Sequence, residues 1–205
     1  MSYKPTMHKA PRLPLLSISL VVIAGLAWLL VANQFGLSVF QQQKSSMLLQ
    51  VGAVNGNTVG DGQIWRLLTS QFLHVNFLHM VFNLIGIYLL ASAIERTAGR
   101  TRLAVIYVVG GTIGQSASVL LRPELVSSGA SQALMALCGF TLLAYRRLSL
   151  PRYAVFCCAA ILAMQVALDL YVSGAIKPGH SFGFMAGLAS VALLLFPRLQ
   201  AEHDA

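Results

Sequence analysis

Charged residues are scarce in this sequence. Only 10% of its 205 residues are Asp, Glu, Lys or Arg, whereas a soluble globular domain has about 25%. Hydrophobic residues make up 57% of the chain, and its mean hydropathy is +0.72. The apolar runs are too many and too long to form the core of one soluble domain. The composition therefore excludes a soluble domain and indicates an integral membrane protein.

Cysteine is also scarce, and the positive net charge is explained by membrane orientation rather than by a nucleic-acid partner. The three cysteines, Cys138, Cys157 and Cys158, lie in apolar segments without a CxxC or cysteine–histidine metal-binding spacing, so we interpret them as packing residues. In a soluble protein, a net charge of +8 would suggest a nucleic-acid partner. Here Lys and Arg lie mostly in tails and short loops, where they set membrane orientation. We therefore expect the lipid bilayer as a partner and no nucleic acid.

The apolar residues form six runs separated by polar or charged segments. We expect transmembrane helices at about residues 15–32, 72–94, 103–121, 130–145, 152–172 and 180–196. The first run is long for a signal peptide and no convincing cleavage site follows it, so we expect it to be retained. The predicted fold class is an all-α polytopic membrane protein, a bundle of six transmembrane helices. Its predicted parts are a tail at 1–14, one domain at 15–197 with a first loop at about 33–71, and a tail at 198–205.

The distribution of Lys and Arg predicts how the chain is oriented. If the amino terminus is cytoplasmic, ten of the 14 Lys and Arg lie in inner loops and tails and four lie outside. This is the positive-inside bias, and it predicts that both termini are cytoplasmic. The second, fourth and sixth helices then begin at the outer surface.

Four polar residues stand out because these three helices carry them near their outer ends. His79 and Asn83 are four residues apart in the second helix and therefore share one helix face. Ser131 lies in the first turn of the fourth helix, and His180 lies at the start of the sixth. We expect the four side chains to meet in the outer half of the bilayer.

These residue types suit acyl transfer. A serine hydroxyl becomes an effective nucleophile when a base accepts its proton, and His180 is the histidine on another helix best placed to do so for Ser131. Backbone N–H groups at a helix start, with the side chains of His79 and Asn83, can donate hydrogen bonds to the developing oxyanion. The sequence therefore predicts a serine protease that works inside the membrane.

Small residues would allow the fourth and sixth helices to approach each other closely. Gly183 and Gly187 form a GxxxG motif just after His180. The small partners on the fourth helix are Ala133, Ala136 and Gly139. We expect this contact to bring His180 within hydrogen-bond distance of Ser131.

Several motifs match a known family, in order and on the expected helices. They are GAVN at Gly52–Asn55, WRLLT at Trp65–Thr69, HVNFLHMVFN at His74–Asn83, GAS at Gly129–Ser131, ALCGF at Ala136–Phe140 and HSFGFMAG at His180–Gly187. In these motifs the chain resembles the rhomboid family of intramembrane serine proteases, over nearly its whole length.

The resemblance implies a catalytic site, a substrate class and a location. Ser131 would be the nucleophile, His180 the general base, and His79 and Asn83 the side chains of the oxyanion hole. The resemblance also implies no cofactor, and single-span transmembrane substrates cleaved near the outer leaflet at a small residue. We expect the protein in the cell membrane, as a multi-pass protein of a bacterial inner membrane.

The resemblance also implies two structural groups of residues. Glu95, Arg96 and Gly99 resemble residues that stabilise the end of the family's second helix. Trp65 and Arg66 resemble the pair that stabilises the first loop in the membrane interface.

One position departs from the family pattern. The family usually has glycine directly after the nucleophile, where this chain has Gln132, and Ser128 is a competing nucleophile because Gly129 follows it. Ser131 is favoured because it has glycines two residues before it and eight after it, whereas Ser128 has neither. Gln132 also raises the question of how closely the helices pack behind the nucleophile.

The sequence also offers two alternative functions and two further candidate residues. Gln132 supports a catalytically inactive relative that binds membrane clients. A small transporter would need an ionisable pathway, but only Asp169 lies within a span besides the outer histidines. Asp169 is a candidate third catalytic residue orienting His180, but the resemblance points to a Ser–His dyad, so it is left out of the predicted site. His74 lies on a different helix face from His79 and is interpreted as structural.

Overall fold

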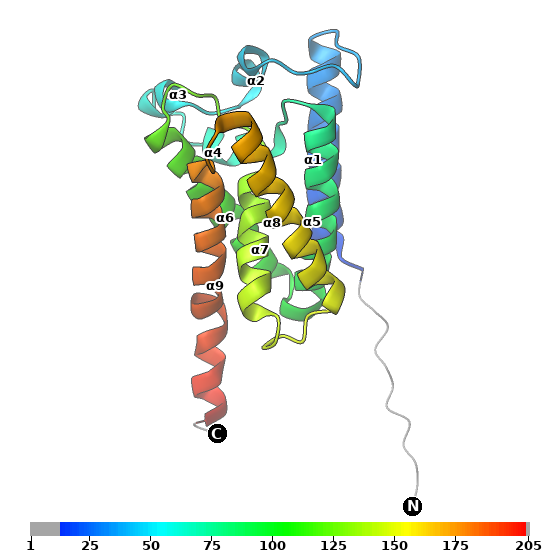
Figure 1. Cartoon of the computed structure of the whole chain (residues 1–205), viewed down its shortest axis with the longest axis vertical. Helices are drawn as coiled ribbons and strands as arrows, with labels where there is room; N and C mark the ends of the chain where they lie inside the picture. Colours follow the sequence, from blue (N-terminus) through cyan, green and yellow to red (C-terminus); the bar gives the residue numbers. More distant parts are fainter. Residues whose placement is uncertain (1–12, 204–205) are drawn as a thin grey trace, which may run out of the picture.

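The computed structural model describes residues 13–203, with side chains as far as residue 194. Across that range the chain has nine α-helices, one short 3-10 helix and no strand, so the all-α part of the prediction is confirmed. The longer helices run along one another in Figure 1; they are α1 (Leu15–Gln34), α5 (Phe77–Ala98), α6 (Arg100–Leu121), α7 (Ser131–Ala144), α8 (Arg152–Ser173) and α9 (Pro178–His203). Most of the predicted tail at 1–14 lies outside the described residues.

The loop between α1 and α5 covers one end of this bundle. It contains α2 (Ser45–Val51), α3 (Gly56–Gly60), α4 (Arg66–Thr69) and the 3-10 helix η1 (Ser70–Phe72). These short helices gather at the upper end in Figure 1, whereas α1 begins and α9 ends at the lower end. The described chain therefore enters and leaves the bundle at the same end, after an even number of passes.

Within the part of the chain that the structure describes, four helices are long and apolar enough to cross a membrane, namely α1, α5, α6 and α8. By contrast, α7 and the apolar part of α9, Pro178–Leu194, are shorter. At about 1.5 Å per residue, the 14 residues of α7 cover roughly 21 Å of the ~30 Å hydrocarbon layer. Twelve of these residues are buried, so neighbouring helices rather than lipid surround α7. That the chain crosses the membrane six times remains a prediction.

Two predicted helix boundaries differ from the structure by five residues or more. The helix predicted from residue 72 begins at Phe77, because η1 ends at Phe72 and the next residue is extended. The Asn76 side chain accepts a hydrogen bond from His79 N (2.8 Å) and caps the new start. The helix predicted to end at residue 196 continues to His203, so the predicted tail at 198–205 is helical up to that residue.

The outward faces of the longer helices are apolar. Large hydrophobic side chains are exposed on α1, α5, α6 and α8, for example Leu30, Ile85, Val109 and Phe156. Contiguous apolar surface of this kind is unfavourable in water but compatible with lipid, where helices satisfy their own backbone groups. The described chain is therefore built as a membrane-embedded bundle.

Glu95 joins the end of α5 to the start of α1. Its carboxylate accepts hydrogen bonds from Leu16 N (3.1 Å), Ser17 N (2.8 Å), Ser17 Oγ (2.7 Å) and Arg100 Nε (3.0 Å). The N–H groups in the first turn of a helix have no partner within that helix. Glu95 therefore caps α1 from a neighbouring helix, which fits the structural role implied by the resemblance.

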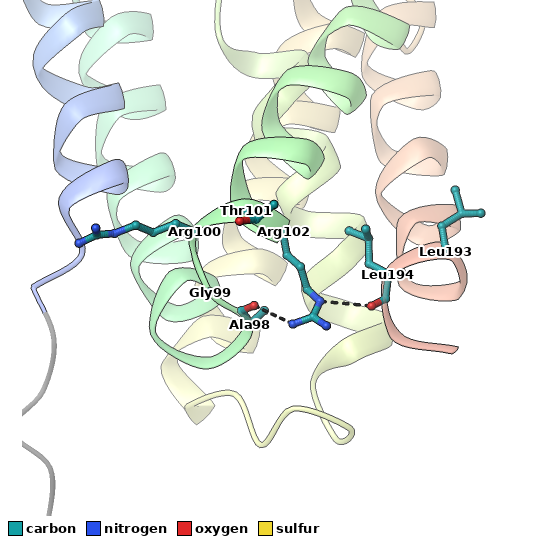
Figure 2. Close-up of a pocket in the computed structure, with 7 residues that line it drawn as sticks. All are labelled: Ala98, Gly99, Arg100, Thr101, Arg102, Leu193 and Leu194. Atoms are coloured by element: carbon teal, nitrogen blue, oxygen red, sulfur yellow. Dashed lines mark hydrogen bonds between the residues drawn. The ribbon is translucent and has the colours of Figure 1, made fainter. Parts of the chain in front are cut away.

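The turn between α5 and α6 depends on Gly99 and Arg102. Gly99 has a φ of 89°, which glycine adopts without strain, and only this residue separates the two helices. Figure 2 shows Arg102 reaching the carbonyl oxygens of Ala98 (2.9 Å) and, on α9, of Leu194 (3.2 Å). A shallow hollow of about 420 Å³ lies beside them. Arg102 thus links three helices at the end where α1 begins.

We predict that Glu95→Ala lowers the free energy of unfolding by about 2–4 kcal/mol, because it leaves the N–H groups of Leu16 and Ser17 without an acceptor. Thermal unfolding in detergent would measure the change. The matched control is Glu124→Ala, at an exposed position in the loop before α7, which should change stability by less than about 0.5 kcal/mol. A Glu95→Ala variant as stable as the control would contradict the capping role.

Candidate active site

Helices α7 and α9 pack with almost no side-chain atoms between their backbones. On α9, Gly183 lies against the carbonyl oxygen of Gln132, and Gly187 lies against that of Ala136. On α7, Gly139 lies against the backbone of α9. A Cβ atom at any of these glycines would overlap backbone atoms of the other helix. The predicted close approach of these two helices is confirmed.

This packing brings the first residue of α7 beside the first turn of α9. Ser131 Oγ lies 2.8 Å from His180 Nε2, a good hydrogen-bond distance. Both side chains are buried, with exposed fractions of 2% and 5%. The hydroxyl of Ser128, the competing residue, is buried without a hydrogen-bond partner among the described residues. The arrangement can therefore transfer a proton from Ser131 to His180.

The other nitrogen of the His180 ring contacts an acid that was left out of the predicted site. His180 Nδ1 lies 2.6 Å from Asp169 Oδ2, and Asp169 is only 1% exposed. The hairpin between α8 and α9 creates this contact, since Gly174, with a φ of 68°, ends α8 and Pro178 begins α9. The signal in the sequence was an intramembrane acid 11 residues before a histidine that begins the next helix.

His79 and Asn83 lie on the same face of α5. A Cβ atom on Gly129 would lie 3.5 Å from His79 Cε1 and 3.7 Å from Ser131 Oγ, so the side chains of His79 and Ser131 border the same point. Asn83 Nδ2 donates a hydrogen bond to His79 O (2.7 Å), and Asn83 Oδ1 is buried without a partner among the described residues. The Asn83 amide is therefore directed at its own helix in this structure.

His74 has a contact that the sequence did not indicate. It lies between η1 and α5, fully buried, and its Nε2 accepts a hydrogen bond from Ala130 N (3.3 Å). Burial, assisted by the nearby His79, lowers the pKa of His74 to about 3. His74 is therefore neutral near pH 7 and keeps the lone pair that anchors Ala130, the residue before Ser131.

The first loop holds the segment that precedes α7. Val54 and Ser127 exchange backbone hydrogen bonds of 3.2 and 2.7 Å, and Gly129 N donates to Ser70 O (2.9 Å). Because these bonds fix the chain on both sides of Ser128, they also fix where α7 begins. The first loop thus positions the backbone next to Ser131.

Arg66 organises the first loop itself. Its Nη1 donates to the carbonyl oxygens of Leu49 (2.6 Å) and Ala53 (2.9 Å), and its Nε donates to Gln63 Oε1 (2.6 Å). The guanidinium also lies over the Trp65 ring, 4.7 Å from its centroid. These contacts fit the role that the resemblance implied for Trp65 and Arg66.

Gln132 does not separate α7 from α9. Its backbone faces Gly183, and Gly114 on α6 leaves space for its Cβ and Cγ atoms. Its side-chain amide joins a polar cluster, in which Nε2 donates to Ser127 Oγ (3.4 Å) and Oε1 accepts from Gln115 Nε2 (3.4 Å). The close packing behind Ser131 is therefore retained with glutamine at this position.

Comparisons with known proteins find a family and several relatives. The family model described as "Rhomboid domain" matches residues 61–197. Rhomboid protease GluP of Bacillus subtilis is 30% identical over 157 residues, which cover 75% of this chain and 31% of that protein. YdcA of Bacillus subtilis is 31% identical over 153 residues, covering 72% of this chain and 77% of YdcA. Rhomboid-like protease 3 of Toxoplasma gondii is 29% identical over 183 residues, covering 85% and 68% of the two chains. The chain thus spans less than a third of the length of the first relative and most of the other two.

We predict that Gly187→Ala lowers stability by about 1–3 kcal/mol, the usual cost of overpacking, because the added methyl group would overlap the carbonyl oxygen of Ala136. Separating α7 from α9 would also move His180 away from Ser131, so reaction with a serine-directed fluorophosphonate probe should slow roughly 10-fold or more.

The control for this variant is Gly60→Ala in α3, where an added Cβ meets nothing within 4 Å. Its unfolding temperature and labelling rate should match those of the wild type. Equal stability and reactivity of Gly187→Ala would show that the α7–α9 contact does not set the position of His180.

Proposed function

The chain belongs to the rhomboid family, and from this premise we propose that it is an intramembrane serine endopeptidase with Ser131 as nucleophile and His180 as general base. The observation that carries the proposal is the 2.8 Å separation of Ser131 Oγ and His180 Nε2. The two residues are 49 positions apart in the sequence and come from different helices, yet their reactive atoms meet in a buried position.

The proposed reaction has two acyl-transfer steps. The Ser131 oxygen attacks the carbonyl carbon of the scissile peptide bond while its proton passes to His180 Nε2. The tetrahedral intermediate collapses to an ester as the amine leaves with the proton that His180 carried. Water then attacks the ester, again giving its proton to His180, and the second collapse releases the carboxylic acid and restores the Ser131 hydroxyl.

The oxyanion would form beside α5. The Ser131 backbone N–H, in the first turn of α7, has no acceptor within that helix and can donate to it. The Asn83 amide nitrogen carries two hydrogens, and one of them bonds His79 O. The second hydrogen of the Asn83 amide can turn toward an oxyanion next to Ser131. The His79 ring, which borders the same point, supplies a further donor.

We propose that α7 and α9 cross the membrane together with α1, α5, α6 and α8, as one domain at 15–197 with both termini in the cytoplasm. The positive-inside bias supports this orientation, as does the shared end of the bundle at which α1 begins and α9 ends. Because protein surrounds the short α7, its first residue can lie below the outer surface of the bilayer. At that depth Ser131 would cleave single-span transmembrane proteins near the outer leaflet, at a small residue of the substrate. The location we propose is a bacterial inner membrane.

The alternative is an inactive rhomboid relative that binds membrane clients, and Gln132 was its support. That support is weakened, because Gln132 packs without separating the helices and Ser131 still lies at hydrogen-bond distance from His180. The protease is therefore the function that the geometry favours.

We predict that a fluorophosphonate probe labels the detergent-solubilised protein on Ser131, as mapped by mass spectrometry. The label should disappear in His180→Ala, because the hydroxyl loses its base, and should persist in Ser128→Ala. Label on Ser128 would transfer the nucleophile to that residue. No label, together with no cleavage of a model single-span substrate, would favour the inactive relative.

We predict that Asn83→Ala lowers kcat roughly 10²–10³-fold, the usual effect of removing one oxyanion donor, with a smaller change in KM. Cleavage of a model transmembrane substrate in detergent would measure both constants. The matched control is Asn57→Ala, at an exposed position in α3, which should behave as the wild type. Unchanged kcat in Asn83→Ala would remove Asn83 from the oxyanion hole.

A further inference from the structure

We infer that Asp169 is a positioning residue for His180, so that the reacting unit is Ser131–His180–Asp169 rather than a serine and a histidine alone. This inference rests on the proposed function. Its basis is a continuous chain of buried contacts from α7 through α9 to α8: 2.8 Å between Ser131 and His180, and 2.6 Å between His180 and Asp169.

Apart from the His180 ring, the polar atoms of the described residues that contact the Asp169 carboxylate are hydrogen-bond donors. Besides its contact with His180 Nδ1, Oδ2 accepts from Lys177 N (3.0 Å). Oδ1 accepts from Gln165 Nε2 (3.1 Å) and lies 3.9 Å from Lys177 Nζ. These donors stabilise a negative charge, whereas a protonated acid would place its own hydrogen among them. The surroundings therefore favour the ionised carboxylate.

An ionised Asp169 determines which nitrogen of the His180 ring carries hydrogen. A carboxylate can only accept, so the short contact with Oδ2 requires a hydrogen on Nδ1. Nε2 then has its lone pair directed at Ser131 Oγ. This is the tautomer that a general base needs, and the same carboxylate balances the positive charge on the ring after proton transfer.

The imidazole is held between two helices other than its own. Asp169 on α8 contacts one ring nitrogen, and Ser131 on α7 contacts the other. The glycine contact between α7 and α9 fixes the distance on the Ser131 side. The short hairpin after Gly174 fixes it on the Asp169 side. Asp169 thus restricts both the tautomer and the rotation of the ring.

A purely structural role for Asp169 is the competing explanation. Asp169 accepts a hydrogen bond from the N–H of Lys177, which directly precedes Pro178, the first residue of α9. In this explanation the whole role of Asp169 is to cap the start of α9. An asparagine would cap almost as well. Its oxygen can accept from Lys177 N, and its NH₂ group can donate to Gln165 Oε1, which is buried without a partner among the described residues.

Asp169→Asn therefore separates the two roles. If Asp169 positions and balances His180, kcat for a model transmembrane substrate should fall about 100-fold or more, since a neutral amide cannot balance the imidazolium charge. KM should stay within about threefold and the unfolding temperature within a few degrees. The matched control is Asp61→Asn, at an exposed position after α3, which should cleave at the wild-type rate.

A second measurement needs no change at Asp169. The chain has only five histidines, so the ring nitrogens of ¹⁵N-histidine-labelled protein in detergent can be resolved by NMR, and the His180 signals are those that disappear in His180→Gln. We expect hydrogen on Nδ1 and a lone pair on Nε2 at pH 8. In Asp169→Leu, which removes the acceptor, this preference should be lost.

The outcomes distinguish this inference from the proposed function. Wild-type protein that neither cleaves nor reacts with a fluorophosphonate overturns both. Active wild type, with Asp169→Asn within about threefold of its kcat, overturns only the role of Asp169. A His180 ring with hydrogen on Nε2 in the wild type overturns it as well, even if the variants fail to fold.

Discussion

The backbone contact between α7 and α9 sets the distance between Ser131 and His180. A reacting pair whose members come from two helices can be positioned no more accurately than the helices themselves, and productive geometry tolerates errors of only about 0.5 Å. Glycines at 139, 183 and 187 allow carbonyl groups of one helix to touch the other directly. Without flexible side chains at the contact, the separation of Ser131 and His180 is set by rigid backbone.

Three buried polar side chains of this bundle accept backbone N–H groups where helices begin. Glu95 accepts from the first turn of α1, His74 from the residue before α7, and Asp169 from the residue before α9. Lipid offers no water to satisfy such groups, so a partner must come from the protein. In two of the three cases the capped helix start also presents a site residue, Ser131 or His180. Helix capping and site assembly therefore use the same contacts.

Apolar runs and glycine spacing were sufficient to predict the helices and the close α7–α9 contact, because both are local signals. The assignment of Ser131, His180, His79 and Asn83 to the site stays a prediction. The start of α5 was missed because Asn76 lies inside an apolar run, and only the structure shows it as a cap. Asp169 was set aside and His74 was interpreted only as structural. Their partners, His180 and Ala130, are reached through a tight hairpin and through the first loop, and neither path can be read from spacing alone.

The assignment of Ser131 Oγ and His180 Nε2 as the reacting atoms can be tested by an experimental structure of the protein after reaction with a fluorophosphonate. We predict phosphorus bonded to Ser131 Oγ, the His180 ring still beside that oxygen, and the phosphoryl oxygen on the side of His79 and Asn83. Phosphorus bonded to another residue, or a His180 ring turned away with another base in its place, would contradict it.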